Sequence, residues 1–190
     1  TLRCRPMDYD MINTMAGRKR GYLKVICEDC LSGKCKIHSE PPVRHNRPSW
    51  DEYFMNIAET TATRATCLRH RVGAILVSDR RILSTGYNGA PRGIAHCLDI
   101  GCLRDKLKIP SGKNHELCRA VHAEQNVVIQ AARHGVSTVG SDLYTTLFPC
   151  AVCVKILVNA GIKRIVYKQD YPDDFAKKIL KEARVKSIRF

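Results

Sequence analysis

The fold is decided by the stretch SDLYTTLFPCAVCVKILVNAGIKRIVYKQD, residues 141–170. Two of its runs, 142–147 and 164–168, contain the branched and aromatic residues that favour strands. The residues between them, 150–160, are apolar and long enough to form a helix. Because strand and helix alternate here, the sequence predicts an α/β protein.

The segments on either side of this stretch continue the alternation. Upstream, the runs 72–77 and 81–87 are joined by the turn residues Ser78-Asp79 and predict a hairpin. The remaining predicted elements are helices at about 50–66, 122–134 and 172–183 and a final strand at 185–190. We therefore expect a three-layer α/β/α sandwich around a mixed sheet of about five strands.

The domain is expected to begin at residue 49. Ser49 and Glu52 have the spacing of a capping box, and the helix that follows should bury Phe54, Ile57, Ala58 and Ala65. Residues 1–48 contain several prolines and are predicted to form an irregular extension, whereas residues 49–190 form the folded domain. The stretch 88–118 shows no regular pattern, and a structureless loop of that length is usually functional or held by a ligand.

Composition limits the class of protein. The chain has 190 residues and is 44% hydrophobic, which is enough for one good core. No apolar run approaches the roughly 20 residues that cross a bilayer, and no secretion signal is visible. Several of the ten cysteines form C-x-x-C pairs near histidines, which favours a reducing compartment and bound metal. We therefore expect a cytoplasmic protein without a membrane partner.

The charge is strongly positive. A formal net charge of +14 predicts attraction to phosphate groups. This charge could serve to bind a nucleotide, to bind a nucleic acid or only to keep the protein in solution. The charge does not single out a nucleic acid, because no long basic run marks a nucleic-acid arm. A nucleic-acid partner therefore stays open at this point.

Two short motifs carry the chemistry. His122-Ala-Glu124 is predicted to begin one helix, and Pro149-Cys150-Ala-Val-Cys153 begins the next. The positive end of a helix dipole stabilises thiolates, so the cysteines alone would also fit a redox dithiol. A redox pair has no use for His-x-Glu, however. One histidine and two thiolates provide three zinc ligands and leave a fourth position for water, the arrangement of a catalytic zinc site.

Glu124 has a different expected role. It lies two residues from His122, where it cannot easily become a fourth ligand but can face the bound water and transfer its proton. Together the two motifs form the signature H-x-E…P-C-x-x-C of zinc deaminases that act on cytosine or adenine. The sequence therefore predicts His122, Cys150 and Cys153 as zinc ligands and Glu124 as the catalytic acid and base.

The surrounding sequence narrows the family. The stretches TCLRHRVGAILVSDRRILSTGYNGAPRGIAHC, HAEQN and TLFPCAVCVKILVNAGIKRIVY resemble deoxycytidylate (dCMP) deaminases, including the bacterial late-competence type, over roughly residues 49–170. The resemblance implies a cytidine-deaminase-like fold and hydrolysis of dCMP to dUMP and ammonia. It also implies a homo-oligomer and regulation by deoxynucleoside triphosphates with Mg²⁺.

The resemblance also implies roles for single residues. Asn88, in the motif YNG, matches an asparagine that contacts the sugar or phosphate, although turn geometry alone would explain it. Tyr171 matches a tyrosine near the substrate phosphate, although an ordinary surface tyrosine is the favoured interpretation. Arg133 matches a position linked with subunit contact and regulation, and an exposed arginine at a helix end is the simpler interpretation.

Further cysteines suggest structural zinc. Some dCMP deaminases carry a structural zinc whose ligands match Cys67 and Cys97, and the sequence offers partners for them in the 88–118 region. The favoured set is Cys67, Cys97, Cys102 and Cys118, with His115 in reserve. A second cluster in the N-terminal extension has C-x₂-C-x₄-C-x₂-H spacing, compatible with a closed zinc site, and consists of Cys27, Cys30, Cys35 and His38. Free cysteines are the alternative for both groups.

Two other functions stay open. The first is a deaminase that acts on cytidine or adenosine in RNA or DNA, which the basic charge favours and the 6% aromatic content disfavours. The second is a non-catalytic zinc protein that binds nucleic acid. The presence of Glu124 argues against the second, because a structural zinc does not need a proton shuttle.

Overall fold

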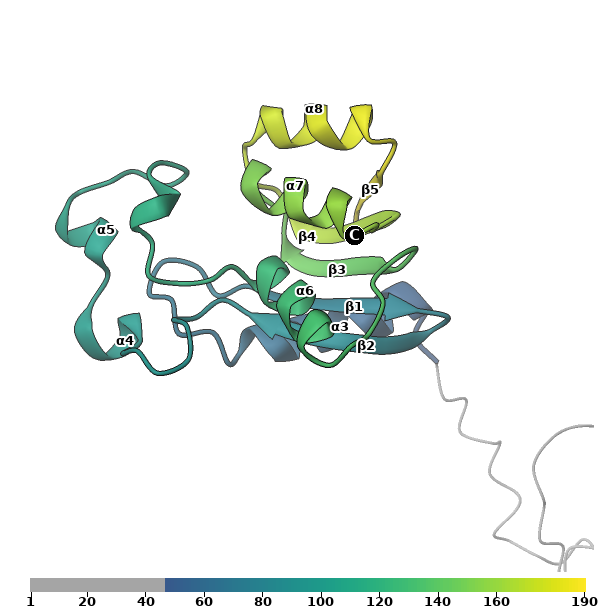
Figure 1. Ribbon diagram of the computed structural model, residues 1–190, viewed down its shortest axis with the longest axis horizontal. Helices are drawn as coiled ribbons and strands as arrows, with labels where there is room; N and C mark the ends of the chain where they lie inside the picture. Colours follow the sequence, from purple (N-terminus) through teal and green to yellow (C-terminus); the bar gives the residue numbers. More distant parts are fainter. Residues whose placement is uncertain (1–46) are drawn as a thin grey trace, which may run out of the picture. The chain divides into compact units, whose positions relative to one another are not determined.

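The computed structural model describes residues 47–190. The predicted cluster of Cys27, Cys30, Cys35 and His38 lies outside the described residues, as does most of the predicted extension. The elements in chain order are α3 (Trp50–Ala62), β1 (Gly73–Ser78), β2 (Arg81–Tyr87), α4 (Cys97–Ile100), α5 (Leu103–Lys106), the 3₁₀ helix η2 (His115–Leu117), α6 (Ala123–Arg133), β3 (Asp142–Leu147), α7 (Ala151–Asn159), β4 (Arg164–Gln169), α8 (Asp174–Glu182) and β5 (Lys186–Arg189) (Figure 1).

The five strands form one mixed sheet, as predicted. Their order is β2-β1-β3-β4-β5. Strand β1 is antiparallel to both of its neighbours, whereas β3, β4 and β5 are parallel to one another. The parallel pairs are connected by α7 and α8, which is the connection that parallel strands require.

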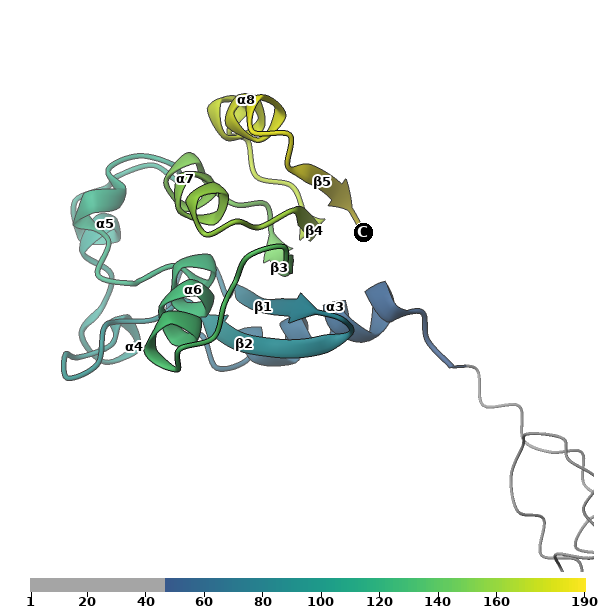
Figure 2. The same cartoon turned by 45° about the vertical axis from the view of Figure 1, so that its right-hand side comes forward.

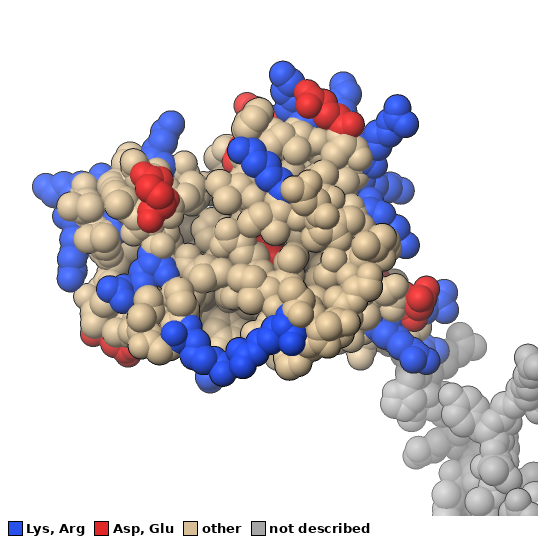
Figure 3. Space-filling view, viewed as in Figure 1, with Lys and Arg blue, Asp and Glu red and all other residues tan. Residues whose placement is uncertain are grey.

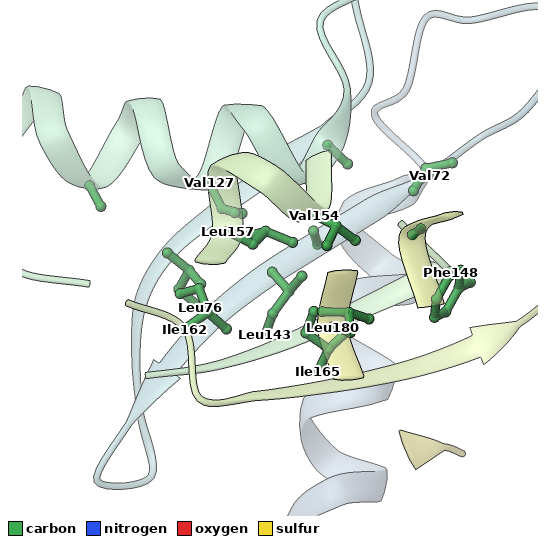
Figure 4. Packing of buried hydrophobic residues seen from close by; sticks show 14 residues of the cluster. Val72, Leu76, Val127, Leu143, Phe148, Val154, Leu157, Ile162, Ile165 and Leu180 are labelled. Atoms are coloured by element: carbon green, nitrogen blue, oxygen red, sulfur yellow. The ribbon is translucent and has the colours of Figure 1, made fainter. Parts of the chain in front are cut away.

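Helices cover both faces of the sheet, which confirms the three-layer sandwich (Figures 1 and 2). Helices α6, α7 and α8 pack on one face, where Val127, Val154 and Leu180 meet Leu76, Leu143 and Ile165 (Figure 4). Helix α3 packs on the other face, where Phe54, Met55 and Ala58 meet Ile75, Val77, Tyr144 and Val166. Each face of the sheet therefore has its own hydrophobic core.

Two glycines let helices lie directly on the sheet. A Cβ atom on Gly86 of β2 would stand 2.6 Å from the carbonyl oxygen of Ala123 and 2.7 Å from the backbone nitrogen of Val127. A Cβ atom on Gly73 of β1 would overlap the backbone of Ala58 and Ala62 in α3. The first turn of α6 can therefore rest against β2 only because residue 86 has no side chain.

The predicted details of α3 were partly wrong. The capping box is present, since the Ser49 hydroxyl accepts from the Glu52 N–H at 3.2 Å and the Glu52 carboxylate accepts from the Ser49 N–H at 3.0 Å. The helix ends at Ala62, however, four residues before the predicted end. Ala65 is buried outside the helix. Met55, which was not predicted, is fully buried, whereas Ile57 is only partly buried against the same core.

Two further predictions are corrected. The turn between β1 and β2 uses Asp79 and Arg80, both with positive φ, one residue later than expected. The stretch 88–118 is not structureless, because it contains α4, α5 and η2 (Figure 1). These helices are three or four residues long, too short for an amphipathic period to appear. Between residues 47 and 190, no helix combines the length and the apolar character that crossing a bilayer would require.

Candidate metal centre and active-site pocket

Helix starts bring the two sequence motifs together. His122 is the N-cap of α6, and Cys150 is the N-cap of α7 with Cys153 in the first turn of that helix. The two helices pack side by side on one face of the sheet (Figure 1). The fold therefore places the histidine and both thiols at neighbouring helix N-termini, where the backbone favours negative charge.

The distances fit a zinc ion. His122 Nδ1 lies 3.6 Å from Cys150 Sγ and 3.3 Å from Cys153 Sγ. Tetrahedral zinc bonds of the usual lengths would separate a nitrogen and a sulfur ligand by about 3.6 Å. The three ligand atoms all lie within 4.8 Å of one another, and they form the one such group among the residues that the structure describes.

The electrostatics of the thiols also suit a cation. Hydrogen bonds from Cys153 and His122 outweigh burial and lower the pKa of Cys150 to about 4. The hydrogen bond to Cys150, together with burial, raises the pKa of Cys153. A bound cation would favour the thiolate form of both cysteines.

Glu124 lies beside this group without belonging to it. Its carboxylate oxygen Oε2 is 3.8 Å from Cys153 Sγ, and 5% of the residue is exposed. Burial raises the pKa of Glu124. A carboxyl group with a raised pKa next to a reacting centre can both accept and release a proton.

These groups open into one pocket. Its walls come from the segment before β1, from the 88–118 stretch, and from the starts of α6 and α7. Figure 3 shows the molecule hollowed between the part that carries α4 and α5 and the main body. Nearly all of the predicted site residues that the structure describes line it, namely Cys67, Asn88, Cys97, Cys102, His115, Cys118, His122, Glu124, Cys150 and Tyr171.

The proposed second metal set is gathered but not closed. Four cysteines line the same pocket, namely Cys67, Cys97, Cys102 and Cys118. Cys97 is the first residue of α4, and Cys102 is the N-cap of α5. Burial, followed by the charges of Cys67, Cys102 and Cys118, raises the pKa of Cys97. Their sulfur atoms do not form a second group within 4.8 Å in the described part of the chain.

His115 lies elsewhere. Its ring is inclined at 74° to that of His122, with 5.4 Å between ring centroids. The charges that act on its pKa come from Cys150, His122, Arg104 and Asp173, while burial has the largest effect and lowers it. The structure thus places the reserve ligand beside the first metal centre.

Asn88 uses its side chain to hold the pocket wall. The amide oxygen accepts from the Val72 N–H at 2.9 Å, and the amide nitrogen donates to the His70 carbonyl at 2.7 Å. The residue is 7% exposed. These contacts shape the segment before β1, so the structure gives Asn88 a positioning role whether or not it also contacts substrate.

Replacing Asn88 by alanine should therefore reduce stability. The change leaves the buried Val72 N–H and the part-buried His70 carbonyl without partners, which costs about 1–3 kcal/mol. The free energy of unfolding in urea should fall by that amount, and any catalytic activity of the pocket should fall with it. Asn56→Ala, at an exposed position of α3, is the matched control and should change little. An N88A protein as stable as the control would contradict the positioning role.

Sequence reasoning missed four basic residues of the pocket, namely Arg69, His70, Arg104 and Arg119. Arg69 and His70 lie within the quoted stretch TCLRHRVGA, so their proximity to Cys67 was a usable signal. Arg104 carried none, because its burial depends on how the 97–118 segment folds back.

Comparisons with known proteins agree with this arrangement. Residues 48–169 match the family model described as the cytidine and deoxycytidylate deaminase zinc-binding region. The chain is similar to ComE operon protein 2 of Bacillus subtilis, with 39% identity over 140 residues that cover 73% of this chain and 70% of that protein. It is also similar to deoxycytidylate deaminase of Schizosaccharomyces pombe, with 41% identity over 128 residues. That match covers 67% of this chain and 39% of the yeast protein, so the chain spans about two fifths of that relative.

A solved structure has the same fold. The dCMP deaminase from the cyanophage S-TIM5, in complex with dCMP and dUMP, superposes with a TM-score of 0.62 at 28% identity. The match covers 77% of this chain and 100% of the phage chain. The described domain therefore corresponds to a complete chain in that structure.

Proposed function

The chain belongs to the family of cytidine and deoxycytidylate deaminases, and from this membership we propose that it hydrolyses dCMP to dUMP and ammonia. The observation that carries the proposal is a buried glutamate beside a His-Cys-Cys group in one pocket. The relatives named as deoxycytidylate deaminases, and the phage enzyme bound to dCMP and dUMP, support dCMP as the substrate.

His122, Cys150 and Cys153 would hold the zinc ion. When bound, zinc acts as a Lewis acid that makes water a better nucleophile near neutral pH. Glu124 then performs the proton transfers. Its carboxylate accepts a proton from the attacking water as the water oxygen forms a bond to C4 of cytosine, and the protonated carboxyl donates that proton to ring N3.

The second half of the reaction releases ammonia. Glu124 accepts the proton that remains on the new hydroxyl group and donates it to the amino nitrogen on C4. The bond between C4 and that nitrogen breaks, and the electron pair leaves with ammonia while the oxygen becomes a carbonyl. One water is consumed, and Glu124 ends as a carboxylate, ready for another cycle. Burial of Glu124 raises its pKa and so favours the protonated carboxyl, which must donate to ring N3 and to the amino nitrogen.

An ammonia-release assay tests the proposal. Zinc-loaded protein should release ammonia from dCMP at physiological salt, and a single-stranded oligonucleotide that contains cytidine should react far more slowly. Only the net charge of +14 favours the polynucleotide alternative. A large advantage for the strand would favour that alternative, and no ammonia from any cytosine or adenine compound would favour a non-catalytic zinc protein.

We also propose a structural zinc held by Cys67, Cys97, Cys102 and Cys118. The gathering of four thiols in one wall of the pocket supports it. In the full chain, Cys97→Ser with Cys102→Ser should lower the zinc content by one equivalent per chain in elemental analysis. Unchanged zinc content would contradict the site. The paired variant Cys27→Ser with Cys30→Ser is the matched comparison and reports separately on the N-terminal cluster.

The family resemblance also implies that the protein assembles into an oligomer and is regulated by nucleotides. We expect a homo-oligomer whose rate responds to dCTP and dTTP with Mg²⁺. Light scattering at micromolar concentration tests the assembly, and initial rates with and without each nucleotide test the regulation.

A further inference from the structure

Arg104 is a buried cation with no acidic partner. It belongs to α5, and 6% of it is exposed. None of the salt bridges between described residues includes it. A buried charge is costly unless an opposite charge and hydrogen bonds compensate for it. The structure therefore contains a positive charge that lacks its counter-charge.

The hydrogen bonds of Arg104 leave part of its guanidinium group unused. Nη2 donates to the carbonyl oxygens of Pro110 at 3.1 Å and Lys113 at 2.6 Å. Nε is buried and has no hydrogen-bond partner. The loop carbonyls thus fix the orientation of the guanidinium group while its Nε donor stays unsatisfied. A buried donor without a partner is expected where a ligand supplies the acceptor.

Two neighbours also have an unsatisfied buried nitrogen, although Arg69 differs from Arg104 because its Nε pairs with Asp105 at 3.3 Å. Four buried side-chain nitrogen or oxygen atoms among the described residues have no partner, and three of them are nitrogens of Arg69, Arg104 and His115. All three residues line the same pocket as the metal centre. We call these three residues the anion site. Unsatisfied buried nitrogens thus concentrate in the pocket where substrate is proposed to bind.

The nearby acidic residues have other partners, and Asp105 forms an ion pair with Arg69 at 3.3 Å rather than with Arg104. Glu124 is the sole carboxylate that lines the pocket, and its role is at the metal centre. Glu116 accepts from the Asn114 amide at 2.8 Å. Asp173 accepts from the backbone N–H groups of Ala151 and Ala176 at 2.8 and 2.9 Å. The compensating anion for Arg104 must therefore come from outside the described domain.

The loop tied by Arg104 closes against Tyr171. A Cβ atom on Gly112 would stand 2.9 Å from the Tyr171 hydroxyl oxygen, so the loop approaches the ring at a residue without a side chain. Arg69 Nη2 donates to the Ile109 carbonyl, in the same loop, at 3.0 Å. Two arginines and a tyrosine therefore meet at one wall of the pocket, and planar guanidinium groups suit the recognition of phosphate.

We propose that Arg104 is the counter-charge for the 5′-phosphate of the substrate and sets the preference for the nucleotide over the nucleoside. This inference rests on the proposed deamination of dCMP. Arg69 and His115 provide further donors of the anion site. A monophosphate supplies the missing negative charge and the acceptor oxygens at once, whereas deoxycytidine leaves Arg104 uncompensated.

Comparing dCMP with deoxycytidine tests the proposal. Arg104→Gln should lower kcat/KM for dCMP by about 10- to 100-fold, the expected loss of a charged hydrogen-bonding partner. Most of the loss should appear in KM, and kcat/KM for deoxycytidine should stay within about threefold, the scatter expected of context. Arg104→Lys keeps the charge without the planar fork and should fall between the wild type and R104Q.

Lys106→Gln is the matched control. Lys106 lies on the same short helix and also donates to a carbonyl oxygen, that of Ile100 at 3.1 Å, but it is exposed and does not line the pocket. Its loss should leave the ratio of kcat/KM for the two substrates unchanged. If R104Q lowers kcat/KM equally for both substrates, Arg104 only anchors the loop and the proposal is wrong.

Binding of inorganic phosphate separates this inference from the proposed function. Phosphate should raise the Tm of the wild type and of K106Q, and it should raise the Tm of R104Q and R104K less. This measurement needs no turnover, so it decides the role of Arg104 even if dCMP proves not to be the substrate. A phosphate response that is absent from the wild type, or equal in R104Q, would overturn the proposal.

Discussion

Glu124→Gln is expected to lower kcat for dCMP by roughly 10²- to 10⁴-fold, the usual contribution of a positioned acid and base. Glutamine has nearly the same shape as glutamate but cannot accept and return a proton. The zinc content should not change, because Glu124 lies outside the group of ligand atoms formed by His122, Cys150 and Cys153. Initial rates and elemental analysis on the same preparation measure both effects.

The control for this prediction is Glu116→Gln. Glu116 lies in η2, close to the pocket in sequence, but it is exposed and does not line the pocket. Its kcat should stay within about twofold of the wild type, as for most surface substitutions. An E124Q enzyme that retains full turnover with its zinc would show that another group transfers the protons.

Cys150→Ser is expected to remove one zinc equivalent per chain and to reduce deamination to the background of the assay. Serine is a poor zinc ligand, and Cys150 is the thiol that the surrounding hydrogen bonds favour as a thiolate. The stabilisation by zinc at this centre should also be lost, since a ligand that binds only the folded state raises the unfolding free energy by about 2.7 kcal/mol at a hundred times its dissociation constant.

Thermal unfolding with and without added zinc completes that test. The Tm of the wild type should rise with zinc by more than that of C150S. Cys4→Ser is the matched control, because Cys4 belongs to none of the cysteine groups identified in the sequence. A C150S protein that keeps its full zinc content, or its activity, would contradict the assignment of the metal centre.

The sequence predicted the β3–α7–β4 unit within one residue at each end. Its strands are rich in branched residues, its helix is apolar, and the patterns are long enough to be unambiguous. The metal centre was predictable for a different reason. Few chemistries other than zinc deamination need His-x-Glu and Pro-Cys-x-x-Cys together, and the fold only had to bring two helix starts together.

The walls of the pocket were harder to predict. Helices as short as α4 and α5 have no visible period, so the 88–118 stretch looked irregular. The burial of Arg104 depends on carbonyl groups of residues six and nine positions later, which no composition pattern encodes. For Asn88, the sequence allowed a turn or a substrate contact, and neither interpretation included the two bonds that it makes across the pocket wall.

The contact of Gly86 with the first turn of α6 has a consequence for protein engineering. The backbone of Ala123 meets β2 at a position with no room for a methyl group, one residue after a metal ligand. The two closest approaches in this contact are to backbone atoms of α6. The reactive side chains can therefore be replaced to seek new chemistry without disturbing the packing of α6 on β2. A directed-evolution library on this scaffold should randomise pocket residues that do not hold the pocket wall. It should keep Asn88, and glycine at residues 73 and 86, because substitutions there would cause misfolding before any catalyst could be selected.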